Sequence, residues 1–279
     1  MKLIKHTPLL LTLVIFPALF LGVYTMKWHQ VPQNIWVLNI AFVFVSIFLG
    51  LLFLRFRQNF SAVNTYLLIA GAILLLLATF LSKPVLDVHR WVNIGGMRLN
   101  TGLIVSPLLL IQIYKLDSVK NASIIGLLTT IIFFLQPDAS LVMAFSIPAV
   151  LIIGRKLKST SHKIIMTIFT ITFVLMAWYN LDKLLPIDYV EGIVQLANKI
   201  SFTYQLLAVL SLVLLLFPFF FYHKETLAVA LGTYYAFLLI ATIFGNFPVM
   251  IMGYGVSPII GYSIGLFRII AQMEDNKQI

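Results

Sequence analysis

The chain has 279 residues, of which 61% are hydrophobic and only 10% are charged, and its mean hydropathy is +1.03. A soluble domain carries roughly 25% charged residues, so this composition excludes an ordinary soluble protein. The absence of cysteine excludes disulfides, thiol catalysis and cysteine-ligated metal sites. The net charge of +10 is explained by basic loops on one side of a membrane, so it does not indicate nucleic-acid binding.

Long apolar stretches recur along the whole chain, and they are typical of helices that cross a membrane. The sequence therefore predicts an all-α, polytopic membrane helix bundle that forms a single domain over residues 1–279. The first stretch is interpreted as a retained helix, because it is long for a signal peptide and has no A-x-A-like exit. The ten expected spans cover roughly residues 8–26, 34–54, 64–82, 101–115, 121–136, 139–154, 163–181, 201–222, 226–245 and 255–271. The fourth to sixth, at roughly 15 residues each, are shorter than a hydrocarbon core of about 30 Å requires.

The distribution of lysine and arginine predicts the orientation. With ten spans both termini lie on one side, and that side collects 13 of the 19 Lys and Arg residues, against 6 on the other. This bias places both termini in the cytoplasm of a multi-pass plasma-membrane protein. The most basic segment, 155–163, is then a cytoplasmic contact for anionic lipids. The loops 83–100, 182–200 and 246–255 share the outer face, whereas a miscounted helix would divide them between the two sides.

The loop 83–100 is the first polar segment with candidate binding residues. It carries Arg90 and Arg98, and Trp91 follows Arg90 directly. An arginine beside a tryptophan at a membrane surface can bind phosphate through two hydrogen bonds while the ring lies among headgroups. Gly95 and Gly96 permit a tight turn. The alternative interpretation is an interfacial anchor followed by that turn.

A lone aspartate lies between the fifth and sixth expected spans, in the sequence Gln136-Pro137-Asp138. Polar groups at membrane depth are costly, so they usually have a function. One interpretation is a carboxylate presented to a polar cavity, to a metal or to Arg90. The other is an N-cap, in which Asp138 accepts hydrogen bonds from the first backbone N–H groups of the sixth span. The two interpretations are compatible.

The loop 182–200 contains a predicted amphipathic helix that lies on the outer leaflet. Asp188 and Glu191 have the spacing of a capping box, with aspartate in place of serine or threonine. Either carboxylate is a candidate general base, and the alternative role is helix capping and solvation. The acidic residues expected on the outer side are Asp87, Asp138, Asp182, Asp188 and Glu191.

Three segments together resemble motifs of the SEDS family, which includes FtsW, RodA and SpoVE. The segment 90–100, Arg90-Trp91-Val92-Asn93-Ile94-Gly95 with Arg98-Leu99-Asn100, is similar to the family's R-W-I-x-L-G and Q-P-S-E-L motifs. Leu135-Gln136-Pro137-Asp138 is similar to its L-Q-P-D-x-G-T-A motif. Gly253-Tyr254-Gly255, at the start of the tenth span, is similar to its S-Y-G-G-S-S motif. The order and spacing of these motifs agree with the ten-span layout.

The resemblance implies a role in bacterial cell-wall synthesis, cell division or cell shape. Members polymerise the lipid-linked disaccharide precursor of peptidoglycan, usually with a transpeptidase, a penicillin-binding protein, as partner. The resemblance implies that Arg90 and Asp138 line an outward cavity for the diphosphate of the precursor. Trp91, Arg98 and Gln136 are further substrate-binding candidates, and a divalent cation is a candidate cofactor with no ligands assigned.

The chain also departs from the family pattern. The family's intramembrane Glu and Lys are absent, and the aspartate taken as the catalytic acid before the eighth span has no counterpart in residues 199–205. The catalytic candidates are therefore Asp138, Asp188 and Glu191. Two hypotheses stay open: a glycosyltransferase, and a catalytically inactive relative that acts as a scaffold or binds the precursor. A transporter is a third, but no paired inverted repeat supports it.

Overall fold

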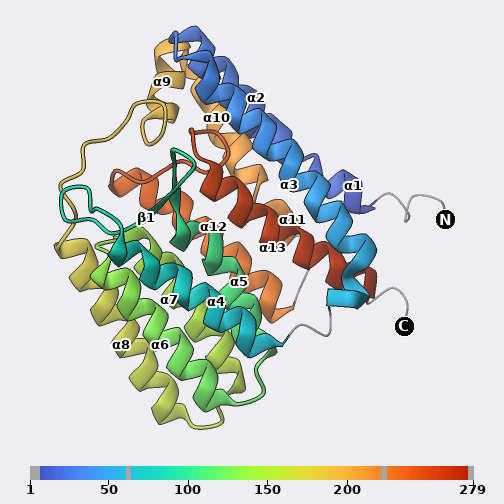
Figure 1. Cartoon of the computed structure of the whole chain (residues 1–279), viewed down its shortest axis with the longest axis vertical. Helices are drawn as coiled ribbons and strands as arrows, with labels where there is room; N and C mark the ends of the chain where they lie inside the picture. Colours follow the sequence, from blue (N-terminus) through green and yellow to red (C-terminus); the bar gives the residue numbers. More distant parts are fainter. Residues whose placement is uncertain (1–6, 61–63, 221–224, 276–279) are drawn as a thin grey trace. The chain divides into compact units, whose positions relative to one another are not determined.

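The computed structural model describes residues 7–60, 64–220 and 225–275 (Figure 1). Within these ranges seven helices are long and apolar enough to cross a membrane: Leu10–Trp28, Gln33–Arg57, Ala139–Lys156, Thr160–Tyr179, Phe202–Phe220, Thr226–Phe244 and Val256–Asp275. Three shorter apolar helices cover Thr65–Leu81, Thr101–Lys115 and Val119–Leu135. These ten segments coincide with the ten predicted spans, so the all-α multi-pass prediction is confirmed. The prediction of a short sixth span is wrong, because that helix has 18 residues and extends to Lys156.

The chain divides into two compact units. The first unit comprises Met1–Ser61, Leu185–Lys224 and Leu239–Ile279, and the second comprises Ala62–Leu184 and Glu225–Leu238. Helix α12 (Thr226–Phe244) contributes its first part to the second unit and its last part to the first. The organisation of residues 1–279 as a single domain stays a prediction.

The second unit is built from helices whose first turns are capped by side chains. Its elements are α4 (Thr65–Ala78), the 3-10 turn η2 (Thr79–Leu81), α5 (Thr101–Lys115), α6 (Val119–Leu135), α7 (Ala139–Lys156) and α8 (Thr160–Tyr179). An oxygen of the capping side chain accepts a hydrogen bond from a first-turn N–H in each of the five α-helices, which satisfies groups that the helix leaves unpaired. The caps are Asn64, Asn100, Ser118, Asp138 and Ser159.

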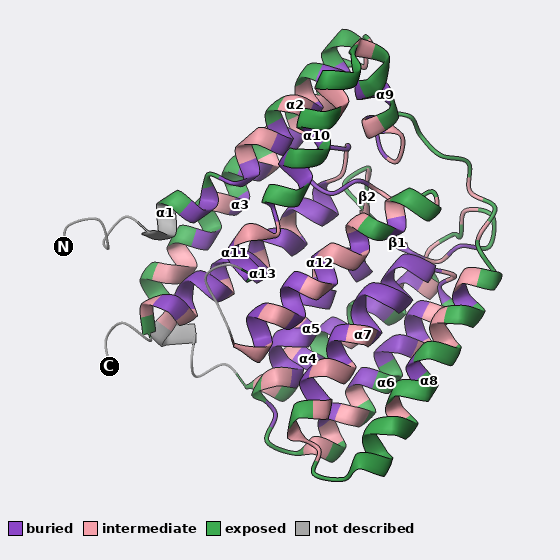
Figure 2. Ribbon diagram, turned by 180° about the vertical axis from the view of Figure 1, so that it is seen from behind, coloured by how far each residue is buried: buried purple, intermediate pink, exposed green. Residues whose placement is uncertain are grey.

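Helix α7 is the central helix of this unit. It packs against α5, α6 and α8, and 67% of its apolar window is buried. Only 11% of the corresponding window of α8 is buried, although α8 is equally apolar. Figure 2 shows the same contrast between the two helices. Apolar side chains outside the protein core are stable in hydrocarbon, so we expect the exposed side of α8 to contact lipid.

Lys156, the last residue of α7, binds the end of α5. Its Nζ donates hydrogen bonds to the carbonyl oxygens of Ile113 at 3.0 Å, Tyr114 at 2.7 Å and Leu116. The last carbonyls of a helix have no partner within the helix, and a cation stabilises them through the helix dipole. Lys156 therefore joins the α5–α6 turn to the end of α7.

Replacing Lys156 by methionine is expected to lower the free energy of unfolding by about 1.5–3 kcal/mol, the range for hydrogen bonds to a charged group. Denaturant titration in detergent measures the loss. The matched control is Lys158→Met, since Lys158 is exposed on the turn that follows. A change within about 0.5 kcal/mol is expected for the control. Equal losses for the two variants would contradict the assigned role of Lys156.

The first unit contains α1 (Thr7–Thr12), α2 (Ile15–Trp28), α3 (Gln33–Phe60), α9 (Ile193–Ile200), α10 (Phe202–Leu214), α11 (Phe217–Phe220) and α13 (Val256–Asp275). Helix α3 packs along α13, and α2 packs on α3, α9 and α10. At one end of the α3–α13 pair, the Arg57 Nε lies 3.0 Å from the Asp275 carboxylate. On α2, the Leu21 carbonyl accepts a hydrogen bond from the Tyr204 hydroxyl of α10 at 3.1 Å.

The polar loop 83–100 contains a β-hairpin. Residues Trp91–Ile94 (β1) and Met97–Asn100 (β2) form an antiparallel hairpin, which the sequence did not predict. The predicted tight turn is confirmed, because Gly95 and Gly96 join the strands with φ values of 57° and 82°. Two successive positive φ angles are the pattern of a type I′ turn, which matches the twist of a hairpin.

The predicted division of the helix in the loop 182–200 into an apolar and a polar face is confirmed, but its predicted first residue is wrong. Ile193, Leu196 and Ala197 are buried, whereas Gln195, Asn198 and Lys199 on the opposite face are exposed. The capping box is wrong, because α9 begins at Ile193 after an uncapped Gly192. The preceding residues form a turn instead, in which Glu191 Oε2 accepts a hydrogen bond from the Ile187 N–H at 2.7 Å.

Candidate functional site

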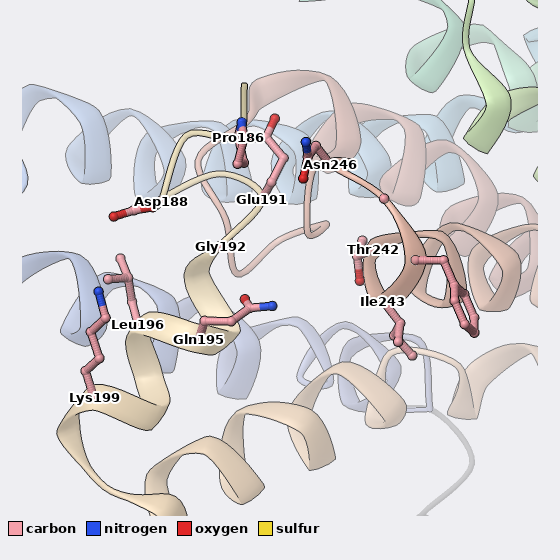
Figure 3. Close-up of a pocket in the computed structure, with 12 residues that line it drawn as sticks. Pro186, Asp188, Glu191, Gly192, Gln195, Leu196, Lys199, Thr242, Ile243 and Asn246 are labelled. Carbon is pink, nitrogen blue, oxygen red and sulfur yellow. The ribbon is translucent and has the colours of Figure 1, made fainter. Parts of the chain in front are cut away.

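A pocket of about 400 Å³ lies in the first unit (Figure 3). Its volume is within the range of small-molecule sites, roughly 300–1,000 Å³. Two of the three predicted catalytic candidates, Asp188 and Glu191, line it. The other lining residues are Pro186, Gly192, Gln195, Leu196, Lys199, Thr242, Ile243, Phe244, Gly245 and Asn246. The pocket is thus formed by α9, the turn before α9, and the end of α12 with the residues that follow.

The two carboxylates differ in orientation. Asp188 points away from Thr242 and Asn246 in Figure 3. Gln195 extends from α9 toward Thr242. The Glu191 carboxylate is engaged by its own turn, because its Oε2 accepts a hydrogen bond from the Ile187 N–H at 2.7 Å.

The backbone around the pocket is held by the segment 246–255. The Val249 N–H donates to the Val190 carbonyl at 3.2 Å, and the Tyr254 N–H donates to the Tyr189 carbonyl at 2.9 Å. Any Cβ at position 253 would overlap the Val190 carbonyl oxygen, so glycine permits this close approach. The glycine motif at 253–255 thus joins this segment to the turn that carries Glu191.

Asn39 of α3 fixes the same segment from the other side. Its Nδ2 donates to the Gly253 carbonyl at 2.9 Å, and its Oδ1 accepts from the Gly255 N–H at 3.2 Å. The side chain is fully buried, so both bonds replace hydrogen bonds to water. Sequence analysis missed Asn39, although an asparagine in the middle of an apolar span was a signal that could have found it.

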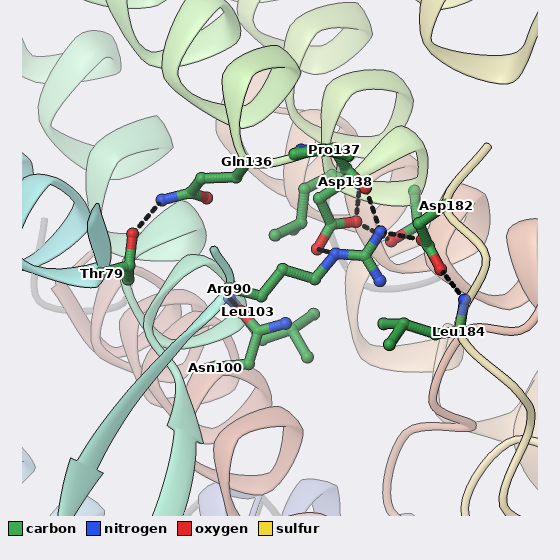
Figure 4. A network of polar contacts seen from close by, with 11 residues as sticks. Thr79, Arg90, Asn100, Leu103, Gln136, Pro137, Asp138, Asp182 and Leu184 are labelled. Carbon is green, nitrogen blue, oxygen red and sulfur yellow. Dashed lines mark hydrogen bonds and ion pairs between the residues drawn. The ribbon is translucent and has the colours of Figure 1, made fainter. Parts of the chain in front are cut away.

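A second candidate site lies in the second unit, where Arg90 meets two aspartates (Figure 4). Arg90 immediately precedes β1, Asp138 is the N-cap of α7, and Asp182 follows α8. The Arg90 Nε lies 3.1 Å from Asp138 Oδ2, and its Nη2 contacts the Asp182 carboxylate and the Pro137 carbonyl. We call Arg90, Asp138 and Asp182 the buried ion cluster.

The carboxylates of the buried ion cluster also accept hydrogen bonds from the chain. Asp138 Oδ1 accepts from the Leu141 N–H at 3.1 Å and from the Ser140 hydroxyl at 2.6 Å. Asp182 Oδ1 accepts from the Leu184 N–H at 2.9 Å. The side chains of the three charged residues are only 4, 2 and 7% exposed. Buried charges are tolerated when geometry and further hydrogen bonds offset the cost of desolvation.

The contacts show which role Asp138 has, a question that the sequence left open. Asp138 is both an N-cap and a partner of Arg90, so the two interpretations hold together. The three segments that supply the cluster meet beside the start of α7 and the end of α8. The guanidinium is occupied by protein oxygens, however, and none of the three cluster residues lines the pocket.

The remaining predicted binding residues differ in their exposure and in their contacts. Gln136 is buried, and its Nε2 donates to the Leu76 carbonyl at 3.1 Å and the Thr79 hydroxyl at 2.9 Å. Trp91 is half-buried on β1, and Arg98 is exposed on β2 opposite Asn93. Binding of substrate by these residues stays a prediction.

Comparison with known proteins gives the fold. No family model matches the chain, and no curated protein matches it significantly in sequence. The crystal structure of the Thermus thermophilus rod shape determining protein RodA aligns with a TM-score of 0.67 at 15% identity, covering 96% of this chain and 97% of that one. The chain has the RodA fold. An aspartate-to-alanine variant of the same RodA aligns with a TM-score of 0.67 at 14% identity, covering 96% and 98%.

The RodA fold is the fold that the resemblance to the SEDS family implied. Within it, the eighth span of this chain begins at α10 with Ser201 as its N-cap, and the Ser201 hydroxyl oxygen accepts from the Tyr204 N–H at 3.0 Å. The region where the resemblance implies a catalytic aspartate, residues 199–205, thus contains a capping serine and no carboxylate. Among the described residues, no three His, Asp or Glu side chains gather in a way that could hold a metal ion.

Proposed function

We propose that this protein acts in bacterial cell-wall synthesis at the plasma membrane, in division or in cell shape, by binding a lipid-linked glycan precursor. The observation that carries the proposal is a RodA fold that extends over nearly the full length of both chains. The positions of the motif residues support it. Arg90 and Asp138 form the buried ion cluster, and the glycine motif at 253–255 supports the wall of a pocket.

Glycosyl transfer is the first candidate activity. It requires a base that takes the proton of an attacking sugar hydroxyl and a group that stabilises the diphosphate leaving group. Glu191 and Asp188 in the pocket are the candidate bases, and Asp138 is a third from the buried ion cluster. Arg90, Trp91 and Arg98, with a divalent cation, are the proposed partners of the diphosphate.

A non-catalytic relative is the second candidate, in which the chain binds the precursor or acts as a scaffold. The uncharged start of α10 favours it, because no carboxylate occupies the place of the family's catalytic aspartate. Both candidates share binding of the precursor. Both also include a penicillin-binding transpeptidase as partner and an orientation with both termini in the cytoplasm.

The test uses purified full-length protein in nanodiscs with labelled lipid-linked disaccharide precursor, and it measures bound precursor and polymer separately. We expect the precursor to bind. A glycosyltransferase would form polymer, and Glu191→Gln would lower its rate by about 100-fold or more, the usual contribution of a general base. A non-catalytic relative would bind the precursor and form no polymer.

Asp138→Asn and Asp188→Asn are measured in parallel, and Asp117→Asn is the matched control. Asp117 is exposed on the turn between α5 and α6, so its loss is expected to leave binding and polymer unchanged. If the unsubstituted protein does not bind the precursor, the proposed function is wrong for both candidates.

A further inference from the structure

The pocket of the first unit has a negative electrostatic character. Asp188 and Glu191 contribute two carboxylates to its lining and Lys199 contributes one ammonium, so the lining side chains carry a formal charge of −1. The wall formed by Thr242 and Phe244 is the C-terminal end of α12. The C-terminal end of a helix dipole is equivalent to roughly half a negative charge.

This charge distribution disfavours a diphosphate. Phosphate groups are bound by arginine, by lysine or by clusters of backbone N–H groups, and like charges placed together at a binding surface cost several kcal/mol. Lys199 is the one cation among the residues that line the described pocket. A diphosphate would therefore meet two carboxylates and a helix C-terminus with a single ammonium in compensation.

The polar side chains of the lining instead suit a ligand that both donates and accepts hydrogen bonds. Gln195 and Asn246 carry amides, Thr242 carries a hydroxyl, and Glu191 is an acceptor. Phe244, which is 69% exposed, and Leu196 add apolar surface beside them. Sugar rings present hydroxyl and acylamino groups around their edge and C–H groups on their faces, so they match both kinds of surface.

We propose that this pocket binds the uncharged, N-acylated sugar part of the lipid-linked precursor and excludes its diphosphate. The assignment rests on the proposed function, and it adds which part of the precursor enters this site. The volume of about 400 Å³ lies at the small end of the range for ligand pockets, so it holds a headgroup-sized moiety and not the whole precursor. Gln195 and Asn246 are then specificity-determining residues.

The test uses two soluble probes, N,N′-diacetylchitobiose and inorganic pyrophosphate, with the full-length protein in nanodiscs at fixed ionic strength. Saturation-transfer NMR is expected to detect the disaccharide, and pyrophosphate is expected not to displace it. Gln195→Leu should weaken disaccharide binding by about tenfold, as expected for the loss of one or two hydrogen bonds. The matched control is Asn198→Leu, since Asn198 is exposed on the same helix and does not line the pocket.

A second variant tests the charge argument by a gain of binding. Asp188→Asn with Glu191→Gln changes the formal charge of the lining side chains from −1 to +1, while an amide oxygen at 191 can still accept from the Ile187 N–H. Pyrophosphate is expected to bind this variant at least about tenfold more tightly than the unsubstituted protein, because two repulsive charges are removed.

Displacement of the disaccharide by pyrophosphate in the unsubstituted protein would overturn the proposal, as would equal weakening by Gln195→Leu and Asn198→Leu. Absence of disaccharide binding would also overturn it. If the lipid-linked precursor still binds in that case, only the assignment of the pocket fails. If neither the precursor nor the disaccharide binds, the proposed function fails as well.

Discussion

Replacing Arg90 by alanine is expected to lower the free energy of unfolding by about 3–5 kcal/mol, the loss measured when one partner of a buried ion pair is removed. The substitution leaves the carboxylates of Asp138 and Asp182 buried without the guanidinium that lies between them. Two like charges in a region of low dielectric then repel each other and remain desolvated. Denaturant titration of the purified protein in detergent measures the loss.

The matched control is Arg98→Ala, because Arg98 lies in the same hairpin but is exposed. A change within about 0.5 kcal/mol is expected for it, as for most surface substitutions. A second check adds Asp182→Ala to Arg90→Ala. The double variant should lose less unfolding free energy than the two single variants lose in sum, because the second substitution removes a carboxylate that the first left unpaired. Additive losses, or a small loss for Arg90→Ala alone, would show that the cluster does not act as a unit.

The helices could be predicted from the sequence because a membrane leaves the chain few alternatives. Backbone groups in hydrocarbon must be paired within the segment, so each long apolar stretch becomes a helix. The positions of the helix ends were predicted less accurately. The last helix reaches Asp275, beyond the predicted end at residue 271, and there Arg57 of α3 binds Glu274 and Asp275. Contacts of this kind join residues far apart in the chain, and hydropathy does not report them.

The sites were predicted only in part, because they too depend on contacts between residues far apart in the chain. The pairing of Arg90 with Asp138 was expected because both residues belong to motifs that the SEDS resemblance brings together. Asp182 was counted among the outer carboxylates but not assigned to a site, since its neighbours form no motif. Its place in the cluster depends on the position of the chain after α8. The lone amide of Asn39 in an apolar span was a signal, but its partners could not be predicted, because backbone groups of residues 253 and 255 leave no side-chain pattern.

The capping box at Asp188 and Glu191 shows how a correct local pattern can be overridden. The spacing was right for a box, yet the Ile187 carbonyl accepts the N–H groups of Val190 and Glu191 and forms a turn there. The Val190 carbonyl is in turn engaged by Val249. The tertiary contact therefore determines where α9 begins, and it places Glu191 on the pocket wall instead of inside a helix.

The second large effect is expected at Gly22 of α2, which lies against the backbone of the segment 246–255. A Cβ at this position would lie 2.9 Å from the Met252 Cα and would overlap its carbonyl oxygen. Backbone atoms cannot rotate away as the end of a side chain can, so the segment itself must move. Gly22→Ala is expected to destabilise the protein by about 3 kcal/mol, at the upper end of the usual cost of overpacking.

Gly71→Ala in α4 is the matched control for Gly22→Ala. Both glycines lie in helices, but a Cβ at position 71 would meet no heavy atom within 4 Å. Alanine loses less conformational freedom than glycine when a helix forms, so the control should be neutral or more stable by up to about 1 kcal/mol. Thermal and denaturant unfolding in detergent measure both variants. Because Met252 precedes the glycine that contacts the Val190 carbonyl, Gly22→Ala should also weaken disaccharide binding, whereas Gly71→Ala should not. Equal stability of the two variants would mean that α2 does not hold this segment in place.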